Sequence, residues 1–63
     1  MTANEERFYA DEVRHYAMTT IFGLVNLANA LQRLGMDEDC KQVLETACDI
    51  CGQAHDAFIT AQN

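Results

Sequence analysis

The sequence contains no proline, no tryptophan and only three glycines in 63 residues, so few positions can interrupt a helix. It also lacks any run of about 18 to 20 apolar residues that could span a membrane, because polar residues break every apolar stretch. Basic residues are scarce, with four Lys and Arg against ten Asp and Glu and a formal net charge of -6. Such a chain is too acidic for a general nucleic-acid clamp. With 49% hydrophobic residues it is also too apolar for a disordered acidic tail.

Serine is absent as well, and the two histidines, His15 and His55, fall in different predicted helices. Hydrolytic catalysis requires a nucleophile, a base and an orienting acid that converge in a cleft. A domain of 63 residues is too small to enclose such a cleft within its own core. We therefore expect a single non-enzymatic domain over residues 1–63 that uses no cofactor.

Cysteine occurs three times, an odd number, and the first residues contain neither the basic nor the apolar segment of an export signal. This favours a cytoplasmic protein with reduced thiols over a disulfide framework. Four side chains with the chemistry of zinc or copper(I) ligands share adjacent sectors of one predicted helix: Cys40, Cys48, Cys51 and His55. We interpret the cysteines as core residues and expect no bound metal, and we keep a Cys/His metal site in a helical bundle as an alternative.

Local signals place two helices and one turn. Gly35 can adopt the left-handed backbone conformation that ends a helix, and Asp37 can then cap the helix that follows. Near the start of the chain, Thr2 and Glu5 have the spacing of a capping box, with Asn4 as an alternative cap. These signals predict helices at about residues 3–34 and about residues 38–61, joined by a turn at 35–37.

Apolar residues recur at alternating spacings of three and four along both predicted helices. The predicted seam of the first helix consists of Ala10, Val13, Ala17, Thr20, Leu24, Leu27, Leu31 and Leu34. That of the second helix consists of Cys40, Leu44, Ala47, Cys51, Ala54, Phe58 and Ala61. Seams of this kind pack knobs into holes, and a short turn makes the two helices antiparallel neighbours. The predicted fold class is therefore all-α, a helix–turn–helix (αα) hairpin.

A second apolar stripe of the first helix lies beside its leucine seam, at Met18, Ile21, Val25 and Ala28, with Phe22 next to it. One hairpin covers only one stripe, and ordering the chain costs roughly 1.5 kcal/mol per residue, which a two-helix core offsets poorly. We expect a homodimer that forms an antiparallel four-helix bundle, although a different protein could cover the second stripe instead. Gly23 is either a close approach at the dimer axis or a tolerated weak spot. The residues expected at the dimer interface and in the core are Met18, Ile21, Phe22, Leu24, Val25, Leu27 and Leu31.

Arg7 and Arg14 lie one heptad apart beside aromatic residues and form the best candidate for RNA contact. Phosphate binding depends on neutralisation and counterion release, however, and the surrounding acids oppose it. We therefore expect another protein as the partner, with a basic target favoured by charge. The expected partner-binding residues are Phe8, Tyr9, Tyr16, Glu45, Asp49 and Asp56.

With its heptad seams and the acidic tight turn at Asp37-Glu38, the chain resembles the Rop family. These are helical hairpins that dimerise into antiparallel four-helix bundles and bind paired RNA loops. The positions that superpose on the RNA-contacting face of the first Rop helix hold no basic or amide side chain: Phe8, His15, Thr19, Gly23 and Ala30. The resemblance implies the same architecture, and a Rop-like RNA regulator remains an alternative function.

In size, acidity and two-helix layout, the chain is also similar to the small helical proteins encoded in the early region of lambdoid bacteriophages. That resemblance implies a regulator in the host cytoplasm that acts on host or phage proteins and biases development toward lysis or lysogeny. Such proteins generally act by binding and not by catalysis.

Overall fold

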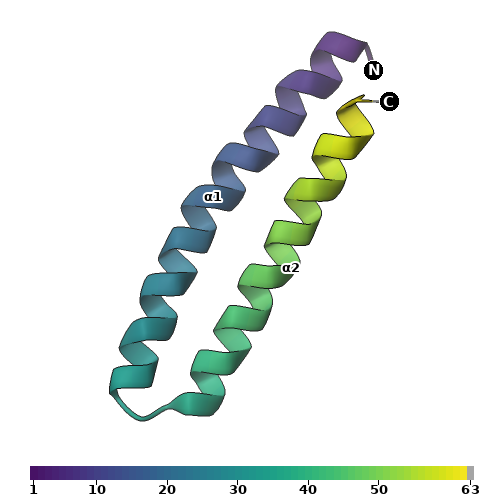
Figure 1. The fold of residues 1–63 in the computed structure, drawn as a ribbon. Coiled ribbons are helices and arrows are strands. Elements are labelled where there is room, and N and C mark those ends of the chain that lie inside the picture. Colours follow the sequence, from purple (N-terminus) through teal and green to yellow (C-terminus); the bar gives the residue numbers. More distant parts are fainter. Residues whose placement is uncertain (63) are drawn as a thin grey trace.

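The computed structural model describes residues 1–62 and consists of two long helices joined by a short turn (Figure 1). Helix α1 spans Ala3–Arg33 and helix α2 spans Asp37–Gln62, and the described residues form no strand. The helices are antiparallel, so the two ends of the chain lie at the same end of the molecule. The predicted all-helical, two-helix fold is confirmed, with helix ends that differ from the predicted ones by one residue at most.

A capping interaction begins α1. Thr2 has the extended backbone of an N-cap residue, and its Oγ1 accepts a hydrogen bond from the Glu5 amide at 3.2 Å. The Thr2 hydroxyl in turn donates to Oε1 of Glu5 at 3.1 Å. Glu5 and Glu6 also place negative charge in the first turn, where the helix dipole favours it. Thr2, and not Asn4, is therefore the cap.

The turn between the helices depends on one glycine. Gly35 has a φ of 79°, and its amide donates to the carbonyl of Gln32 at 3.0 Å. The Met36 amide donates to the carbonyl of Leu31 at 2.9 Å, which completes a Schellman motif. The left-handed conformation predicted for Gly35 is confirmed. The predicted cap is wrong, because Asp37 is already the first residue of α2.

Small residues form the contact between α1 and α2. The most buried side chains are Ala17, Ala28 and Ala47, which are 8%, 3% and 7% exposed, and none of the described buried side chains is polar. Half-buried residues complete the contact: Ala10, Ile21, Leu24 and Leu31 of α1 and Cys40, Val43, Ile50, Ala54, Ala57 and Ala61 of α2. Side chains of this size allow the two helix axes to approach closely.

The seam of α2 differs from the predicted one at alternate positions. Val43, Ile50 and Ala57 face α1, whereas the residues that follow each of them, Leu44, Cys51 and Phe58, are exposed. In α1, Ala28 is buried and the predicted seam residues Thr20, Leu27 and Leu34 are exposed. The physical reason is packing: the buried Ala47 and Ala28 fix the side of each helix that faces the other, and Val43, Ile50 and Ala57 share the side of Ala47. Leu44, Cys51 and Phe58, one position further on, then lie on the flank of the contact.

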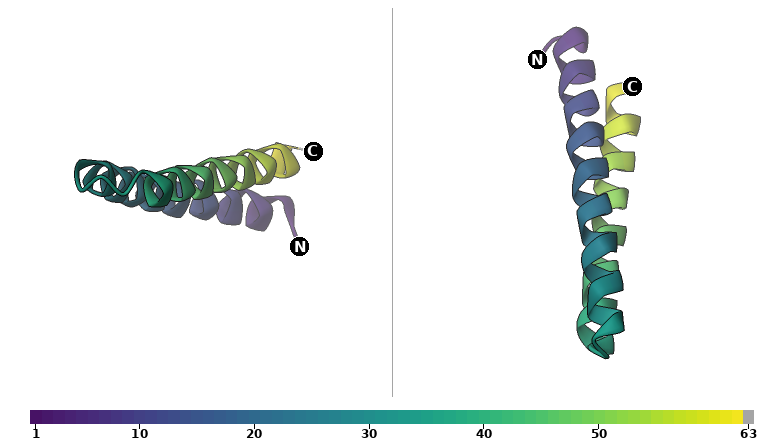
Figure 2. Two further views of the ribbon diagram at one scale, coloured as in Figure 1. Left: turned by 90° about the horizontal axis from the view of Figure 1, so that it is seen from below. Right: turned by 90° about the vertical axis from the view of Figure 1, so that its left-hand side faces the viewer.

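The hairpin is a single elongated layer. It measures 48 × 15 × 12 Å, and residues 1–62 form no second layer above or below the pair of helices (Figure 2). Its radius of gyration is 14.6 Å, against about 10.6 Å for a compact domain of this length. Its accessible surface is 4992 Å², against about 4,100 Å² for a globular monomer of 7.1 kDa. The chain therefore exposes about 900 Å² more than a compact fold of its mass.

Candidate interaction surfaces

Two shallow hollows near the chain ends show that the hairpin has two different faces. Asp11 and Phe58 line one hollow, and Tyr9 and Thr60 line the other. Ala10 and Ala61 belong to both hollows, and both residues lie in the contact between the helices. The hollows therefore lie on opposite sides of that contact. Because residues seven apart share one side of a helix, each hollow marks a face that continues along the hairpin.

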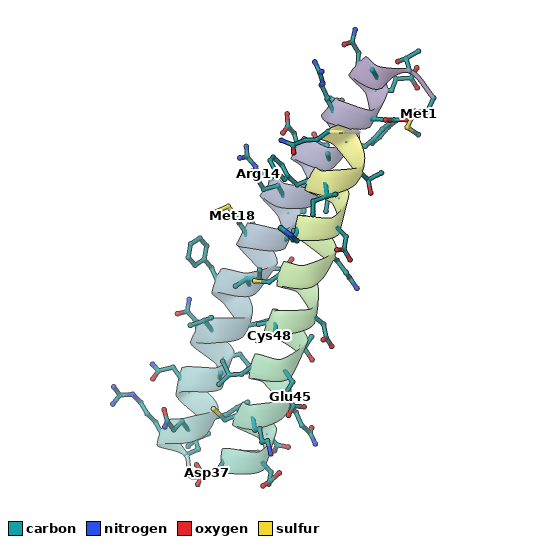
Figure 3. All side chains as sticks on the ribbon, turned by 45° about the vertical axis from the view of Figure 1, so that its right-hand side comes forward. Met1, Arg14, Met18, Asp37, Glu45 and Cys48 are labelled. Atoms are coloured by element: carbon teal, nitrogen blue, oxygen red, sulfur yellow. The ribbon has the colours of Figure 1, made fainter. Side chains whose placement is uncertain are left out.

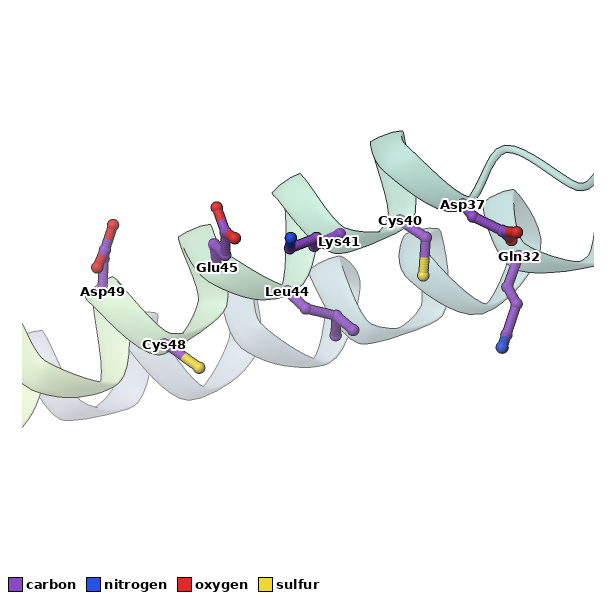
Figure 4. Close-up of a pocket in the computed structure, with 8 residues that line it drawn as sticks. All are labelled: Gln32, Asp37, Cys40, Lys41, Leu44, Glu45, Cys48 and Asp49. Atoms are coloured by element: carbon purple, nitrogen blue, oxygen red, sulfur yellow. The ribbon is translucent and has the colours of Figure 1, made fainter.

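The first surface, here called the Met18 face, continues from the hollow beside Asp11 and Phe58. Its residues are Arg7, Asp11, Arg14, Met18, Val25 and Gln32 of α1 and Asp37, Lys41, Leu44, Cys48, Cys51, His55 and Phe58 of α2. Arg14 and Met18 project from the same side of α1 (Figure 3). A further hollow near the turn joins the two helices on this face, since Gln32, Leu44 and Cys48 all line it (Figure 4). The middle of the face is uncharged and apolar.

The second surface, here called the Tyr16 face, lies on the opposite side. Its residues are Glu6, Tyr9, Val13, Tyr16, Thr20, Leu27 and Leu34 of α1 and Asp39, Thr46, Gln53 and Thr60 of α2. Tyr16 is 62% exposed and Leu34 is 75% exposed. This face combines apolar side chains with hydroxyl and amide groups, and among the described residues that form it none is basic.

The structure does not bring the predicted dimer-interface and core residues together on one surface. Ile21, Leu24 and Leu31 are half-buried and face α2. Met18 and Val25 lie on the Met18 face, with Phe22 at its outer edge. Leu27 lies on the Tyr16 face. The predicted set therefore combines the interior of the hairpin with parts of both exposed faces.

The aromatic residues predicted to bind a partner form two edge-to-face pairs on the N-terminal half of α1. The ring centroids of Phe8 and Tyr9 are 5.2 Å apart at 79°, and those of His15 and Tyr16 are 5.2 Å apart at 76°. All four residues are exposed. Only the tyrosines belong to the Tyr16 face, since Phe8 and His15 occupy the next row around the helix.

The predicted acidic residues lie apart from the aromatic pairs. Glu45, Asp49 and Asp56 are exposed on α2. Asp49 and Asp56 each follow a contact residue by two positions, which turns them about 200° away from α1. Glu45 and Asp49 point away from the Cys48 side of the helix (Figure 4). The structure therefore separates an acidic outer side of α2 from an aromatic end of α1.

The cysteines do not all behave as the predicted core residues. Cys40 is half-buried against α1, whereas Cys48 and Cys51 are exposed on the single hairpin and lie outside the contact between α1 and α2. Within residues 1–62 no group of three or more His, Cys, Asp and Glu side chains is placed to hold a metal ion. A single hairpin thus gives no support to the alternative of a Cys/His metal site.

Neither helix, over the residues that the structure describes, is long and apolar enough to cross a membrane. No family model matches the sequence, and no curated protein or solved structure matches it significantly.

Proposed function

We propose that the protein is a small non-enzymatic regulator that acts by binding another protein, as a homodimer of helical hairpins. The observation that supports the proposal is the number of large apolar side chains that are exposed to solvent. Phe22, Tyr16 and Phe58 are 64%, 62% and 54% exposed, and similar residues lie along both faces. Monomeric proteins rarely leave such extended apolar surfaces uncovered, and protein–protein contact is the usual reason when they do.

The Tyr16 face is the better site for a different protein. Tyrosine side chains combine a large apolar body with a hydroxyl group, and they are enriched at protein interfaces. Glu6 and Asp39 give this face negative charge, which favours a basic target. The resemblance to lambdoid early-region proteins suggests the biological setting, a phage regulator that acts on a host or phage protein.

The position of the basic residues makes a Rop-like RNA function the weaker alternative. A surface for single-stranded nucleic acid combines basic side chains with aromatic ones. Arg7 lines the hollow of the Met18 face, whereas Tyr9 lines the hollow on the opposite side. Arg7 and Tyr9 therefore face in different directions, and Phe58 is the aromatic residue that lines the hollow with Arg7.

Affinity capture from a bacterial lysate, in nuclease-treated and untreated halves, tests the proposal. We expect a protein partner that survives nuclease treatment and is lost when Tyr9 and Tyr16 are both replaced by alanine. The matched control replaces Phe8 and His15, the neighbouring row of exposed rings, and should retain the partner. Recovery only in the untreated half would instead support RNA binding.

A second variant set tests the contribution of charge. Replacing Glu6 and Asp39 of the Tyr16 face, together with Glu45, Asp49 and Asp56 on the outer side of α2, by their amides should weaken partner binding and reduce its dependence on salt, if the target is basic. Unchanged affinity and unchanged salt dependence would contradict a basic target.

A further inference from the structure

We infer that the Met18 face is the surface through which two copies of this chain pair, which leaves the Tyr16 face open for a different protein. The inference rests on the homodimer proposed above and adds to it the surface and the relative orientation of the two copies.

The exposed area of the hairpin supports pairing with a second copy. The hairpin exposes about 900 Å² more than a compact protein of its mass, and a standard interface covers about 800 Å² on each partner. The most buried side chains within the hairpin are three alanines, so the fold has little apolar core of its own. A partner must therefore bury part of the exposed apolar surface whenever the chain is folded. A second copy of the same chain meets that requirement.

Charge favours the same face. Two copies that each carry a charge of -6 repel one another, so they should meet where the local net negative charge is smallest. Three of the four basic residues lie on the Met18 face together with Asp11 and Asp37, and Glu45 and Asp49 also line its hollow near the turn. The basic residues offset most of this negative charge, whereas the Tyr16 face has two acids and no basic residue among its described members.

The Met18 face is also self-complementary about a two-fold axis. In the hairpin Ala10 of α1 lies beside Ala61 of α2. Counting along both helices from this pair, the point halfway between Met18 and Val25 lies at the same height as the point halfway between Cys48 and Cys51. An axis that crosses both helices at that level sets Met18 of one copy opposite Val25 of the other. The same axis sets Cys48 opposite Cys51.

The same operation also matches the polar ends of the face. Asp11 of one copy falls opposite Gln32 of the other, which pairs a carboxylate with an amide donor. Lys41 falls opposite Phe58, which pairs an ammonium group with an aromatic ring. No like charges meet in these pairs, and the apolar residues meet in the middle. The result is an antiparallel four-helix bundle with α1 against α1 and α2 against α2.

Two substitutions on α1 distinguish the faces by sedimentation equilibrium. Val25 and Leu27 are 46% and 48% exposed and lie on opposite faces, so Val25→Lys and Leu27→Lys perturb the hairpin alike. We expect the wild type and Leu27→Lys to be dimers. Val25→Lys should raise the dimer dissociation constant at least about 100-fold, because symmetry brings the ammonium group into the interface twice. Lysine lowers the net negative charge, so repulsion between whole chains does not account for dissociation.

Each other outcome overturns the inference. If Val25→Lys stays dimeric, or if Leu27→Lys also dissociates, the Met18 face is not the pairing surface, although the proposed homodimer stands. A folded wild-type monomer at micromolar concentration would overturn both the homodimer and this inference.

Thiol labelling of the wild type gives a second test that does not depend on any variant folding. In a lone hairpin Cys40 is the protected thiol, since it is half-buried while Cys48 and Cys51 are exposed. Pairing through the Met18 face covers Cys48 and Cys51, while Cys40, which lines the hollow on this face, stays protected. We expect iodoacetamide to modify Cys48 and Cys51 at least about tenfold more slowly at a protein concentration well above the dimer dissociation constant than at one well below it, as read from peptide masses. Equal rates at the two concentrations, for a chain that sedimentation shows to pass from dimer to monomer, would overturn the inference.

Discussion

The three glycines allow one substitution to be tested in three backbone environments. Gly23 and Gly52 lie inside helices, and an added Cβ would have no neighbour within 4 Å at either position. Alanine there should raise the free energy of unfolding by about 1 kcal/mol per chain, because it restricts the unfolded backbone. Gly35 also has open space around it, but its φ is 79°. Alanine should therefore lower the stability by about 1–2 kcal/mol through backbone strain alone.

Urea unfolding followed by far-UV circular dichroism measures all three variants. The chain concentration must be the same in every experiment, because the stability of a dimer depends on it. Each change of about 1 kcal/mol corresponds to a shift of roughly 4–8 °C in Tm for a domain of this size. Gly23→Ala and Gly52→Ala should unfold at a higher urea concentration than the wild type, and Gly35→Ala should unfold at a lower one.

Comparing Gly23→Ala with Gly52→Ala tests which face of the hairpin forms the dimer. Gly23 lies beside the Tyr16 face, so pairing through the Met18 face leaves it uncovered and both helical variants should be stabilised equally. If Gly23→Ala lowers the free energy of unfolding while Gly52→Ala raises it, another copy approaches closely at Gly23. That result would refute the assignment of the dimer to the Met18 face. A neutral Gly35→Ala would refute the left-handed turn.

Three further predictions follow from the caps, the helix contact and the thiols. Thr2→Ala should lower the stability by about 1 kcal/mol and speed amide exchange in the first turn of α1, whereas Thr60→Ala, with an exposed side chain, should do neither. Ala47→Leu should cost about 1–3 kcal/mol in urea unfolding because Ala47 is only 7% exposed, and the exposed neighbour Thr46→Leu should be tolerated. A chelator should leave the Tm unchanged, since no metal-binding group is assembled within residues 1–62; a lower Tm would revive the Cys/His alternative.

Local sequence signals specify the two helices and the turn between them. No proline interrupts the chain, Thr2 supplies a cap, and Gly35 is the residue that adopts a left-handed conformation at low cost. These are local signals, and each acts through residues no more than about five positions away. The aromatic residues of α1 and the seven-residue repeat of its tyrosines can also be read from the sequence, whereas the edge-to-face pairs that they form cannot.

Packing between the helices selects which side of each helix faces the other, and local signals do not. In α2, Val43 and Ile50 form one apolar row and Leu44 and Cys51 form the next, about 100° around the helix. Both rows have the spacing of a seam, so the pattern alone does not choose between them. The choice depends on which row pairs with the alanines across the contact. Ala17, Ala28 and Ala47 are the most buried side chains, so the row of Val43 and Ile50, which shares the side of Ala47, faces α1, and the neighbouring row lies outside, where it forms part of the Met18 face.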